Sequence, residues 1–376
     1  MQDTIDQIDV WACCVPLPAP LPFGTFTVTA RRYVALRVRT AGGLTADVVG
    51  HSRGSPIDVA IADLLAPRLL GADPCDIPAR HKDFLSATVA LERDGVLGRA
   101  WSLLELALQG LKASFAKLPA WQLLGGSARK LTVQLVEGYS LPDESDEAFA
   151  ERLVARTHEG YRALKLEGAH YRDWKTLARR LQLIRRHAPE CRLVVDFAWS
   201  WRRASEHIET LAALESLGID WIEDAFPRDA IGEYAAAARL TRAPLGCGDE
   251  ATRSADLVAL VDGSGLQVVR LDATALGGFS AVLPLVDLFD KRRRRVSFHE
   301  FAEIHEHCAL VGTVVDHIEM FPKDRPFDVR HWLTETSAHE RVQGGSLVPG
   351  NDPGLGVALN MDQVARHSIR HGRIAA

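Results

Sequence analysis

Near its N-terminus the sequence lacks both a long hydrophobic run and a cluster of basic residues. Residues 1–22, MQDTIDQIDVWACCVPLPAPLP, contain acids where a secretion signal would be basic, and prolines interrupt their short apolar stretch. We therefore expect neither a secretion signal nor a membrane-spanning helix. The net charge of -5 also gives no reason to expect nucleic acid or an anionic membrane as a partner.

Paired cysteines are missing as well. The six cysteines include the adjacent Cys13 and Cys14, but no CxxC pair and no spacing typical of a disulfide framework. We expect reduced thiols and therefore a cytoplasmic protein. Charged residues make up 25% and apolar residues 47% of the 376 residues, which is typical of a soluble globular protein. This length suits a large barrel with a smaller companion domain.

From about residue 128 onward, short apolar runs alternate with stretches of helical pattern. Residues 146–160 are one such stretch, which begins with acids, repeats its apolar residues at helical spacing and ends at a glycine. Each interval between runs is long enough for a helical crossover between parallel strands. The pattern predicts an α/β fold with a TIM-type (β/α) barrel, whose active site lies at the C-terminal ends of the strands. The eight predicted strands start near Leu131, Tyr161, Arg192, Asp220, Ala243, Leu266, Arg295 and Asp316.

The first third of the chain has a different pattern. Antiparallel strands joined at Gly42-Gly43 are followed by a long helical stretch that ends in two glycines. We expect residues 1–125 to form an α+β capping domain and residues 126–340 to form the barrel with the active site. Residues 341–376, which are rich in glycine at first, are predicted to fold back and pack on the capping domain.

Ionisable residues recur at the ends of the predicted strands. Side chains alternate in direction along a strand, so parity decides which of them face the barrel interior. Seven consecutive strands carry an ionisable residue of the same parity at their C-terminal ends, and these side chains would converge at one mouth of the barrel. They are Lys165 with Glu167, Asp196, Glu223, Asp249, Asp272, His299 and Glu319.

Three of these residues are carboxylates on neighbouring strands. Asp196, Glu223 and Asp249 follow one another at intervals of 27 and 26 positions. Carboxylates that converge within a few Å repel one another, and a hard divalent cation relieves that repulsion. Ligation by oxygen alone favours Mg2+ over zinc. Glu250 is an alternative third ligand, although its parity is opposite to that of Asp249.

Asp272 and His299 have the features of an acid–base pair. A carboxylate bonded to one ring nitrogen of a histidine fixes its tautomer and raises the basicity of the other nitrogen. The pattern therefore predicts a general base at the end of the seventh strand.

The order of Lys165, Asp196, Glu223, Asp249, Asp272, His299 and Glu319 resembles the mandelate racemase subgroup of the enolase superfamily. The segments LDATALGGFS after the sixth strand and SFHEFAEIHEH after the seventh carry the resemblance further. It implies a magnesium ion that binds the substrate carboxylate and stabilises the enediolate formed when the neighbouring proton is removed.

Each residue receives a role from this resemblance, position by position. The ligands would be Asp196, Glu223 and Asp249, and the Asp272–His299 pair would be the base or acid. Glu319 would donate a hydrogen bond to the enediolate, which requires a protonated carboxyl. Lys165 would contribute positive charge near the substrate carboxylate.

Two positions depart from the family pattern. The second strand usually reads Lys-x-Lys, the second lysine being a base on the face opposite the histidine, whereas this chain reads KLE with Glu167 in that place. Glu167 either pairs with Lys165 or Arg270, or acts as a carboxylate acid or base. The other departure is Ala198, which stands where the family often has an asparagine two residues after the first ligand.

Loops of the capping domain select the substrate in this family. GHSRGSP, residues 50–56, makes His51 and Arg53 candidates for contacting a polyhydroxy acid, with a simple turn as the alternative. LPFGTF, residues 21–26, is the other capping loop, and its apolar character indicates a partly hydrophobic lid. Arg270 is a further candidate for substrate binding.

Together these features predict a magnesium-dependent lyase that acts on a small-molecule carboxylate. We expect dehydration of a sugar acid, an aldonate or aldarate, to a 2-keto-3-deoxy acid. The first alternative is a racemase or epimerase of a 2-hydroxy acid, which requires bases on both faces of the carbon. The second is a catalytically silent barrel used as a binding module. The resemblance also implies a homo-oligomer, from a dimer to an octamer.

Overall fold

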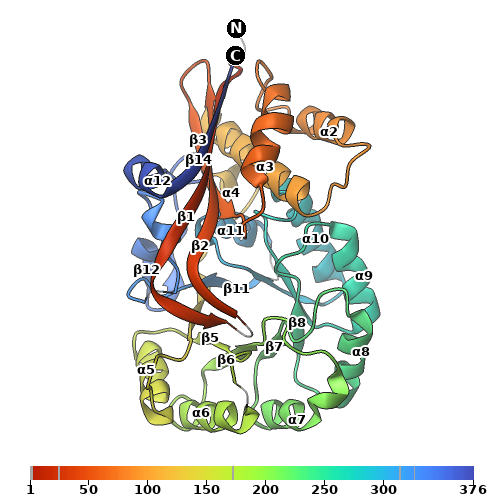
Figure 1. Ribbon diagram of the computed structural model, residues 1–376, viewed down its shortest axis with the longest axis vertical. Helices are drawn as coiled ribbons and strands as arrows, with labels where there is room; N and C mark the ends of the chain where they lie inside the picture. Colours follow the sequence, from red (N-terminus) through yellow and green to blue (C-terminus); the bar gives the residue numbers. More distant parts are fainter. Residues whose placement is uncertain (1–2, 24–25, 172, 313–314, 326) are drawn as a thin grey trace.

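The computed structural model describes residues 3–23, 26–171, 173–312, 315–325 and 327–376. The two ends of the chain lie next to each other at the top of Figure 1, in a cap that stands on a barrel of strands and helices. No helix in the described part of the chain is long and apolar enough to cross a membrane.

The cap is built on an antiparallel sheet of order β14-β1-β2-β3. β14 pairs with β1, so the cap combines the N-terminal region with the C-terminal tail, as predicted. β2 and β3 form the predicted hairpin across Gly42-Gly43, and Gly43 has a φ of 89°, which favours glycine. The four strands are β1 (Ile5–Phe23), β2 (Phe26–Thr40), β3 (Thr45–His51) and β14 (Ser368–Ala375).

β1 is a strand that the sequence pattern does not predict, because its second half contains four prolines. β14 covers β1 only between Gln7 and Cys13, so Pro16, Pro18 and Pro20 lie beyond that pairing. On the other side of β1, the pairing with β2 shifts between Pro16 and Leu21. Prolines are accommodated here because one edge of the strand is open and the ladder on the other edge is interrupted.

Helices of the cap pack against this sheet. The long helix α3 is buried along most of its length and contacts β3 and β2. Gly50 in β3 permits this approach, because a Cβ atom there would lie 2.5 Å from the side chain of Leu103. The segments are α1 (Ile57–Val59), a π-helical segment (Ala60–Leu65), a 3-10 turn (Ala66–Arg68), α2 (Ile77–Ala87), α3 (Val96–Phe115) and α4 (Ala120–Leu123).

Eight parallel strands form the closed barrel, and all eight predicted strands are found. They run in sequence order from β4 to β11, and pairing of β11 with β4 closes the ring. Most of their residues are apolar and buried, and ionisable residues lie at or just beyond the C-terminal ends of β5 to β10 and near the end of β11. The strands are β4 (Leu131–Gly138), β5 (Ala163–Glu167), β6 (Arg192–Asp196), β7 (Trp221–Glu223), β8 (Leu245–Cys247), β9 (Val268–Leu271), β10 (Arg295–Phe298) and β11 (Val315–Met320).

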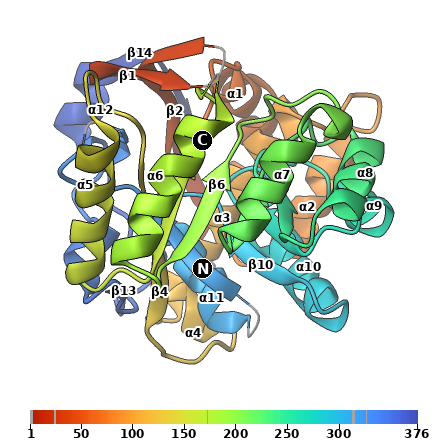
Figure 2. The same cartoon turned by 90° about the horizontal axis from the view of Figure 1, so that it is seen from below.

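A layer of helices surrounds the strands, as the view from below shows (Figure 2). The predicted helix after the first barrel strand begins behind Ser145, whose side chain accepts a hydrogen bond from the N–H of Ala148. The helices are α5 (Asp146–His158), α6 (Trp174–His187), α7 (Ile208–Ser216), α8 (Ile231–Leu240), α9 (Ser254–Ser264), α10 (Phe279–Lys291) and α11 (Ala302–Val311).

The chain after β11 contacts both parts of the molecule. It forms a small hairpin of β12 (Val342–Gln343) and β13 (Ser346–Leu347), and β13 pairs with the start of β4. It then forms α12 (Met361–His367) and enters the cap sheet as β14. The C-terminal region therefore links the first barrel strand to the cap.

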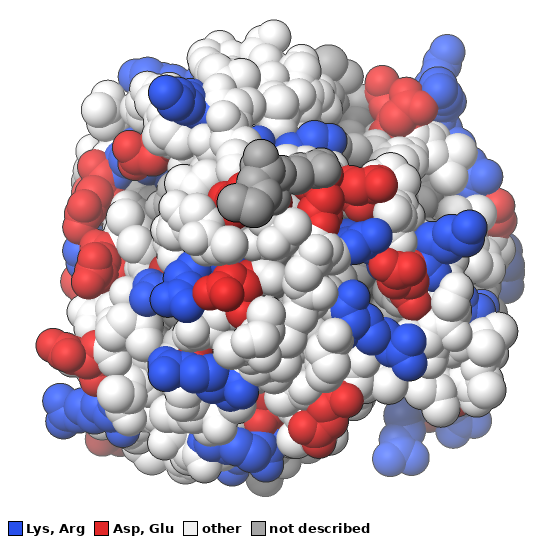
Figure 3. Space-filling model, turned by 90° about the horizontal axis from the view of Figure 1, so that it is seen from above, with Lys and Arg blue, Asp and Glu red and all other residues white. Residues whose placement is uncertain are grey.

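Charges of both signs are interspersed over the face seen from above (Figure 3). The whole chain has 44 basic and 49 acidic residues, so neither sign predominates in the composition.

Candidate active site

A cleft of about 910 Å³ lies between the cap and the loops at the C-terminal ends of the barrel strands. A second, smaller cavity of about 30 Å³ lies at the strand ends themselves. Arg31, Arg53 and Trp199 line both spaces, so the cleft leads to the small cavity. The small cavity is also lined by five residues that the strand pattern singles out: Lys165, Asp196, Asp249, His299 and Glu319.

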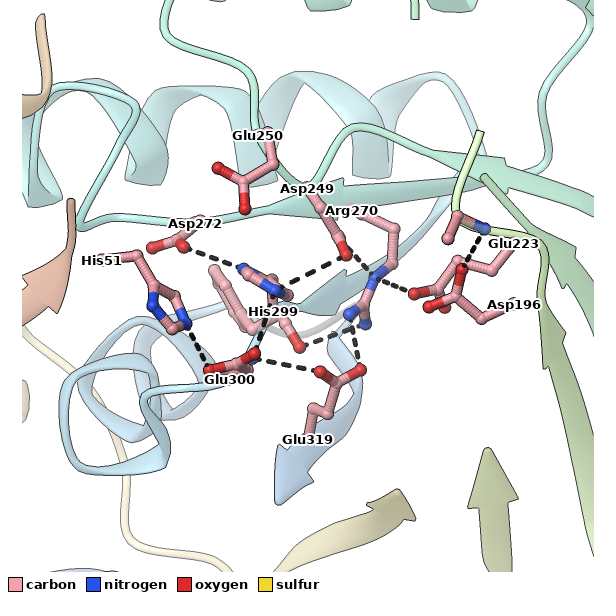
Figure 4. A network of polar contacts seen from close by, with 12 residues as sticks. His51, Asp196, Glu223, Asp249, Glu250, Arg270, Asp272, His299, Glu300 and Glu319 are labelled. Carbon is pink, nitrogen blue, oxygen red and sulfur yellow. Dashed lines mark hydrogen bonds and ion pairs between the residues drawn. The ribbon is translucent and has the colours of Figure 1, made fainter. Parts of the chain in front are cut away.

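The three predicted ligands lie at or just after the ends of neighbouring strands, around the same two basic side chains (Figure 4). The basic side chains of Lys165 and Arg270 lie between these carboxylates. Lys165 Nζ lies 2.7 Å from Glu223 Oε1 and 3.3 Å from Asp196 Oδ2. Arg270 Nε lies 2.7 Å from Asp249 Oδ1 and 3.4 Å from Glu223 Oε1. The acids and cations therefore form one buried, charged cluster.

The pKa values of the acids reflect this crowding. Burial raises the pKa of Asp196 to about 7, and Glu223 adds to the effect while Lys165 opposes it. Burial likewise raises the pKa of Asp249, against the influence of Arg270. Burial alone would raise the pKa of Glu223 too, but Arg270 and Lys165 lower it to about 2. Two of the three acids therefore lack sufficient positive charge nearby.

This donor set fits a hard divalent cation. All three groups are carboxylates, and hard cations take oxygen ligands. A cation beside them would supply the positive charge that Asp196 and Asp249 lack. The adjoining cavity of about 30 Å³ is large enough for a water-sized occupant.

Glu250, the alternative third ligand, is held by other partners. Arg53 Nη2 lies 2.6 Å from Glu250 Oε1, and Arg99 contacts the second carboxylate oxygen. Burial alone would raise the pKa of Glu250, but the two arginines bring it below its usual range. Asp249, in contrast, lines the small cavity and has an oxygen 3.8 Å from His299 Nε2. The geometry favours Asp249, in line with the parity argument.

Asp272 and His299 directly follow β9 and β10 and contact each other (Figure 4). His299 Nδ1 lies 3.0 Å from Asp272 Oδ2. The backbone N–H and the hydroxyl of Thr274 both donate to Asp272 Oδ1 at 2.7 Å. Burial would raise the pKa of Asp272, but His299 and His305 lower it well below its usual range. The ionised carboxylate therefore holds Nδ1–H of His299 and turns Nε2 toward Asp249 and Glu300. Burial would lower the pKa of His299, but Asp249, Asp272 and Glu300 raise it well above its usual value.

Glu300 is a site residue that the sequence pattern misses. Its Oε1 lies 3.5 Å from His299 Nε2, and its Oε2 lies 2.6 Å from His51 Nε2. Alternation along the strand predicts that Glu300 points away from the interior, but its φ of 47° breaks the alternation, and it lines the small cavity. The available signal is an acid directly after the candidate base in SFHEF.

Glu319 accepts hydrogen bonds at both carboxylate oxygens. Lys165 Nζ and Arg270 Nη2 lie 2.7 and 2.6 Å from its Oε2. The backbone N–H of Glu300 donates to its Oε1 at 3.3 Å. In none of these contacts does Glu319 donate a hydrogen bond, so the donor role that the family resemblance implies stays a prediction.

Lys165 is cationic at this site. Burial would lower its pKa, but Glu223 and other acids raise it well above its usual range.

Arg270, which was predicted to bind substrate, is hydrogen-bonded to residues of the site in the barrel interior. It is 0% exposed, and its Nη1 donates to Ser297 Oγ at 2.7 Å and to the Phe298 carbonyl at 3.1 Å. Its other nitrogens contact Asp249 and Glu319. Because its donors are engaged and it is fully buried, it orients carboxylates rather than reaching into the cleft.

Glu167 is buried beside the first ligand. Its Oε1 accepts a hydrogen bond from the N–H of Ala169 at 2.7 Å. Within the described residues it makes no hydrogen bond or ion pair with Lys165 or Arg270, which were its predicted alternative partners. Burial and the charge of Asp196 raise its pKa well above the usual range, which favours the protonated form of this carboxyl.

Ala198, the second departure from the family pattern, also borders the small cavity. Its N–H donates to Asp196 Oδ1 at 2.9 Å, and its φ of 45° is left-handed. Asparagine adopts this conformation more readily than alanine. The backbone contact to the ligand is therefore present without the polar side chain.

The cap residues predicted to touch substrate line the cleft and also contact the barrel, and their contact with substrate stays a prediction. His51 is buried and bonds Glu300, and Arg53 bonds Glu250. The centre of the other capping loop, Gly24-Thr25, lies outside the described residues.

A second charged cluster lies at the opposite, N-terminal ends of the barrel strands. In the described part of the chain, only Asp220, Asp316 and His317 bring three possible ligand atoms within 4.8 Å of one another. Arg192 Nη2 lies 2.8 Å from both aspartates, and Arg295 contacts both as well. The two arginines balance this cluster, which therefore has no charge left for a cation to offset.

Two family models match the chain. One, described as mandelate racemase / muconate lactonizing enzyme, N-terminal domain, matches residues 7–125. The other, described as enolase C-terminal domain-like, matches residues 148–363. These matches cover the cap and most of the barrel.

Individual proteins are similar over most of the chain. An L-talarate/galactarate dehydratase from Salmonella typhimurium is 27% identical over an alignment of 285 positions that covers 73% of this chain and 71% of that protein. A D-mannonate dehydratase from Rhizorhabdus wittichii is 23% identical over an alignment of 385 positions that covers 92% of this chain and 93% of that protein.

Solved structures share the fold. An L-talarate dehydratase from a Polaromonas species, complexed with Mg and L-glucarate, has a TM-score of 0.87 at 22% identity, over 100% of this chain and 99% of that chain. An enolase from Bradyrhizobium, complexed with magnesium and mandelic acid, has a TM-score of 0.86 at 22% identity, over 98% and 99%. With both family models matched along its length, the chain belongs to the mandelate racemase / muconate lactonizing enzyme family, with an enolase C-terminal domain-like barrel.

Proposed function

We propose that the protein is a magnesium-dependent hydro-lyase that dehydrates a sugar acid, an aldonate or aldarate, to a 2-keto-3-deoxy acid. The observation that carries this proposal is that His299, held by Asp272, and the carboxylates of Asp196 and Asp249 line one small cavity, with Glu223 on the strand next to Asp196. Removal of a proton beside a carboxylate needs a base and a centre of positive charge next to the same carbon.

The similar proteins support the substrate class and the metal. The relatives from Salmonella typhimurium and Rhizorhabdus wittichii are named as dehydratases of sugar acids. The structural neighbours from Polaromonas and Bradyrhizobium are complexed with magnesium and a hydroxy acid. This chain has the same fold and carboxylates at the mouth of its barrel, so it is suited to bind magnesium and a hydroxy acid as well.

Three carboxylates, Asp196, Glu223 and Asp249, would hold the metal. Bound there, magnesium would supply positive charge for the substrate carboxylate as negative charge develops on it. Lys165 adds a fixed cation beside two of the same acids. Arg270 orients Asp249 through the 2.7 Å contact between its Nε and Asp249 Oδ1.

His299 takes the α-proton at Nε2, because Asp272 holds the other ring nitrogen. The C–H electron pair forms the enediolate, and the bond between the β-carbon and its hydroxyl then breaks. The hydroxyl leaves as water after it receives a proton, and the enol product tautomerises to the 2-keto-3-deoxy acid. His299 returns the proton when both groups lie on one face, and Glu167, whose pKa burial and Asp196 raise, is the candidate acid otherwise.

A screen of aldonates and aldarates with the purified protein tests this proposal. We expect at least one sugar acid to yield a 2-keto acid in the presence of Mg2+, no product after chelation with EDTA, and recovery when Mg2+ is added back. If the folded, magnesium-loaded protein produces no keto acid from any member, the proposal is wrong.

Incubation of single enantiomers of hydroxy acids in deuterium oxide separates dehydration from racemisation. Two-base racemisation needs a second base opposite His299, and Glu167 stands where the family has the second lysine. We therefore expect no inversion with deuterium incorporation at a rate that matches turnover. Such inversion would make Glu167 the second base and the protein a racemase.

A further inference from the structure

His51 of the cap crosses to the barrel and bonds the residue that follows the candidate base. His51 Nε2 lies 2.6 Å from Glu300 Oε2, and the two residues are only 4% and 6% exposed. Glu300 follows His299 in the chain, and its Oε1 lies 3.5 Å from His299 Nε2. Figure 4 shows His51, Glu300 and His299 as one connected line of contacts.

The backbone after His299 is strained. Glu300 and Phe301 have φ values of 47° and 40°, in the left-handed region that residues with a side chain rarely adopt. Two such residues in succession persist only where their surroundings hold them. This turn also determines how the preceding residue, His299, leaves the strand.

His51 contacts both strained residues. It bonds the Glu300 carboxylate, and its ring meets the ring of Phe301 edge-on, with 5.1 Å between the centroids and an interplanar angle of 72°. The backbone N–H of Glu300 is separately held by Glu319 Oε1. The cap therefore supplies the side-chain contacts, and the barrel supplies the backbone contact, that keep the turn in place.

The position of His51 is itself well defined. The ring of Tyr33 stacks on the ring of His51, with 4.9 Å between the centroids. Tyr33 Oη in turn donates a hydrogen bond to Asp328 Oδ1 at 2.9 Å. Burial and the charge of Arg53 lower the pKa of His51. Burial would raise the pKa of Glu300, but His51 and His299 bring it well below its usual range. A neutral His51 therefore donates its Nε2–H to an ionised Glu300.

We propose that His51 is a positioning residue, which acts through Glu300 to hold the left-handed turn that places His299 Nε2 at the cavity. The cap would thus determine the position of the base, in addition to covering the entrance for the substrate. The inference rests on the proposed function for the role of His299 as a base, whereas the positioning can be measured without any substrate.

Two substitutions of His51 separate the hydrogen bond from the ring packing. His51→Phe keeps a ring between Tyr33 and Phe301 but loses the hydrogen bond. His51→Gln keeps an N–H donor near the place of Nε2. His81→Phe is the matched control, because His81 is an exposed histidine on α2 of the cap.

The first readout is the ring 15N NMR spectrum of the histidines, in which the His299 signals are assigned by their loss in His299→Asn. We expect these signals to shift or broaden in His51→Phe and to stay close to wild type in His51→Gln and His81→Phe. Unchanged His299 signals in a folded His51→Phe protein overturn the proposal.

The second readout is turnover of the sugar acid that the screen identifies. We expect His51→Phe to lower kcat by about 10- to 100-fold with KM within about twofold, as a small displacement of a reacting group does. We expect His51→Gln to recover most of that loss. A raised KM at unchanged kcat would make His51 a substrate-binding residue and would overturn the positioning role.

A substitution of Glu300, the barrel residue that bonds His51, provides a second test of the same hydrogen bond. If His51→Phe does not fold, as judged by thermal unfolding, Glu300→Ala removes the same hydrogen bond and must displace the His299 signals in the same way. Normal His299 signals in Glu300→Ala contradict the proposal. If the screen yields no substrate, the proposed function fails while the NMR comparison still decides the positioning.

Discussion

His299 Nδ1 lies 3.0 Å from Asp272 Oδ2, although the two residues are 27 positions apart in the chain. The contact forms because β9 and β10 are hydrogen-bonded neighbours and both residues directly follow those strands. One ring nitrogen is thereby fixed, and the other faces Asp249 and Glu300 at 3.8 and 3.5 Å. The direction in which the imidazole can accept a proton is thus set by barrel geometry.

Replacing the base should remove activity without removing the metal. We expect His299→Asn to lower kcat by at least the roughly 10²–10⁴-fold that a general base contributes. Asp272→Asn should lose somewhat less, since the ring remains but loses its orientation. Steady-state kinetics and metal analysis together check this. Activity above about a tenth of wild type in His299→Asn would reassign the base to Lys165 or Glu167.

The third metal ligand can be tested with two neighbouring acids. We expect Asp249→Asn to weaken magnesium binding by roughly 10-fold or more, because a direct ligand is lost. Glu250→Gln should be milder, since Arg53 and Arg99 already hold Glu250. Titration calorimetry with Mg2+ measures both. The reverse order of effects would mean that Glu250 is the ligand.

Glu167 is the candidate acid for the leaving hydroxyl, because burial and Asp196 raise its pKa. We expect Glu167→Gln to slow elimination by roughly 10²-fold, the lower end for an acid catalyst, while exchange of the α-proton in deuterium oxide continues. Glu190→Gln, an exposed acid, is the control. Elimination at the wild-type rate in Glu167→Gln would leave His299 as the group that returns the proton.

A buried pair outside the site predicts acid sensitivity. Arg330 Nη1 lies 2.6 Å from Glu303 Oε2. Burial would raise the pKa of Glu303, but Arg330 lowers it from its ordinary value of 4.5 to about 2. A lowered folded-state pKa contributes stability above pH 4.5, and this contribution is lost as the pH falls from 4.5 toward 2.

Urea unfolding at a series of pH values measures that contribution. We expect Glu303→Gln to lower the free energy of unfolding at neutral pH and to reduce its further loss in acid. Glu147→Gln, at an exposed position on α5, should leave the curve unchanged. An equally steep loss in Glu303→Gln and wild type would show that the pair does not supply this acid sensitivity.

The barrel could be predicted because its strands are buried on both faces and read as continuous apolar runs. Parity then placed residues such as Asp196 and His299 on the inner side, and both line the small cavity. β1 could not be predicted in this way, because Pro16, Pro18 and Pro20 argue against a strand wherever an open edge is not foreseen.

The missed parts of the site depend on backbone conformation and on contacts between distant segments. Glu300 follows β10 with a left-handed φ, so the strand alternation gives the wrong direction for its side chain. For His51 and Arg53 the sequence predicts contact with substrate but not their bonds to Glu300 and Glu250, which are 249 and 197 positions away. No local pattern contains such pairings.

The most direct measurement uses the sugar acid found by the screen and quantifies 2-keto-3-deoxy product against substrate consumed. Wild type with Mg2+ should give one product molecule for each sugar acid consumed, and turnover should slow when the α-hydrogen is replaced by deuterium. EDTA-treated wild type and magnesium-loaded His299→Asn should give essentially none. Product that forms equally without magnesium, or equally in folded His299→Asn, would contradict removal of the α-proton by His299 at a magnesium site.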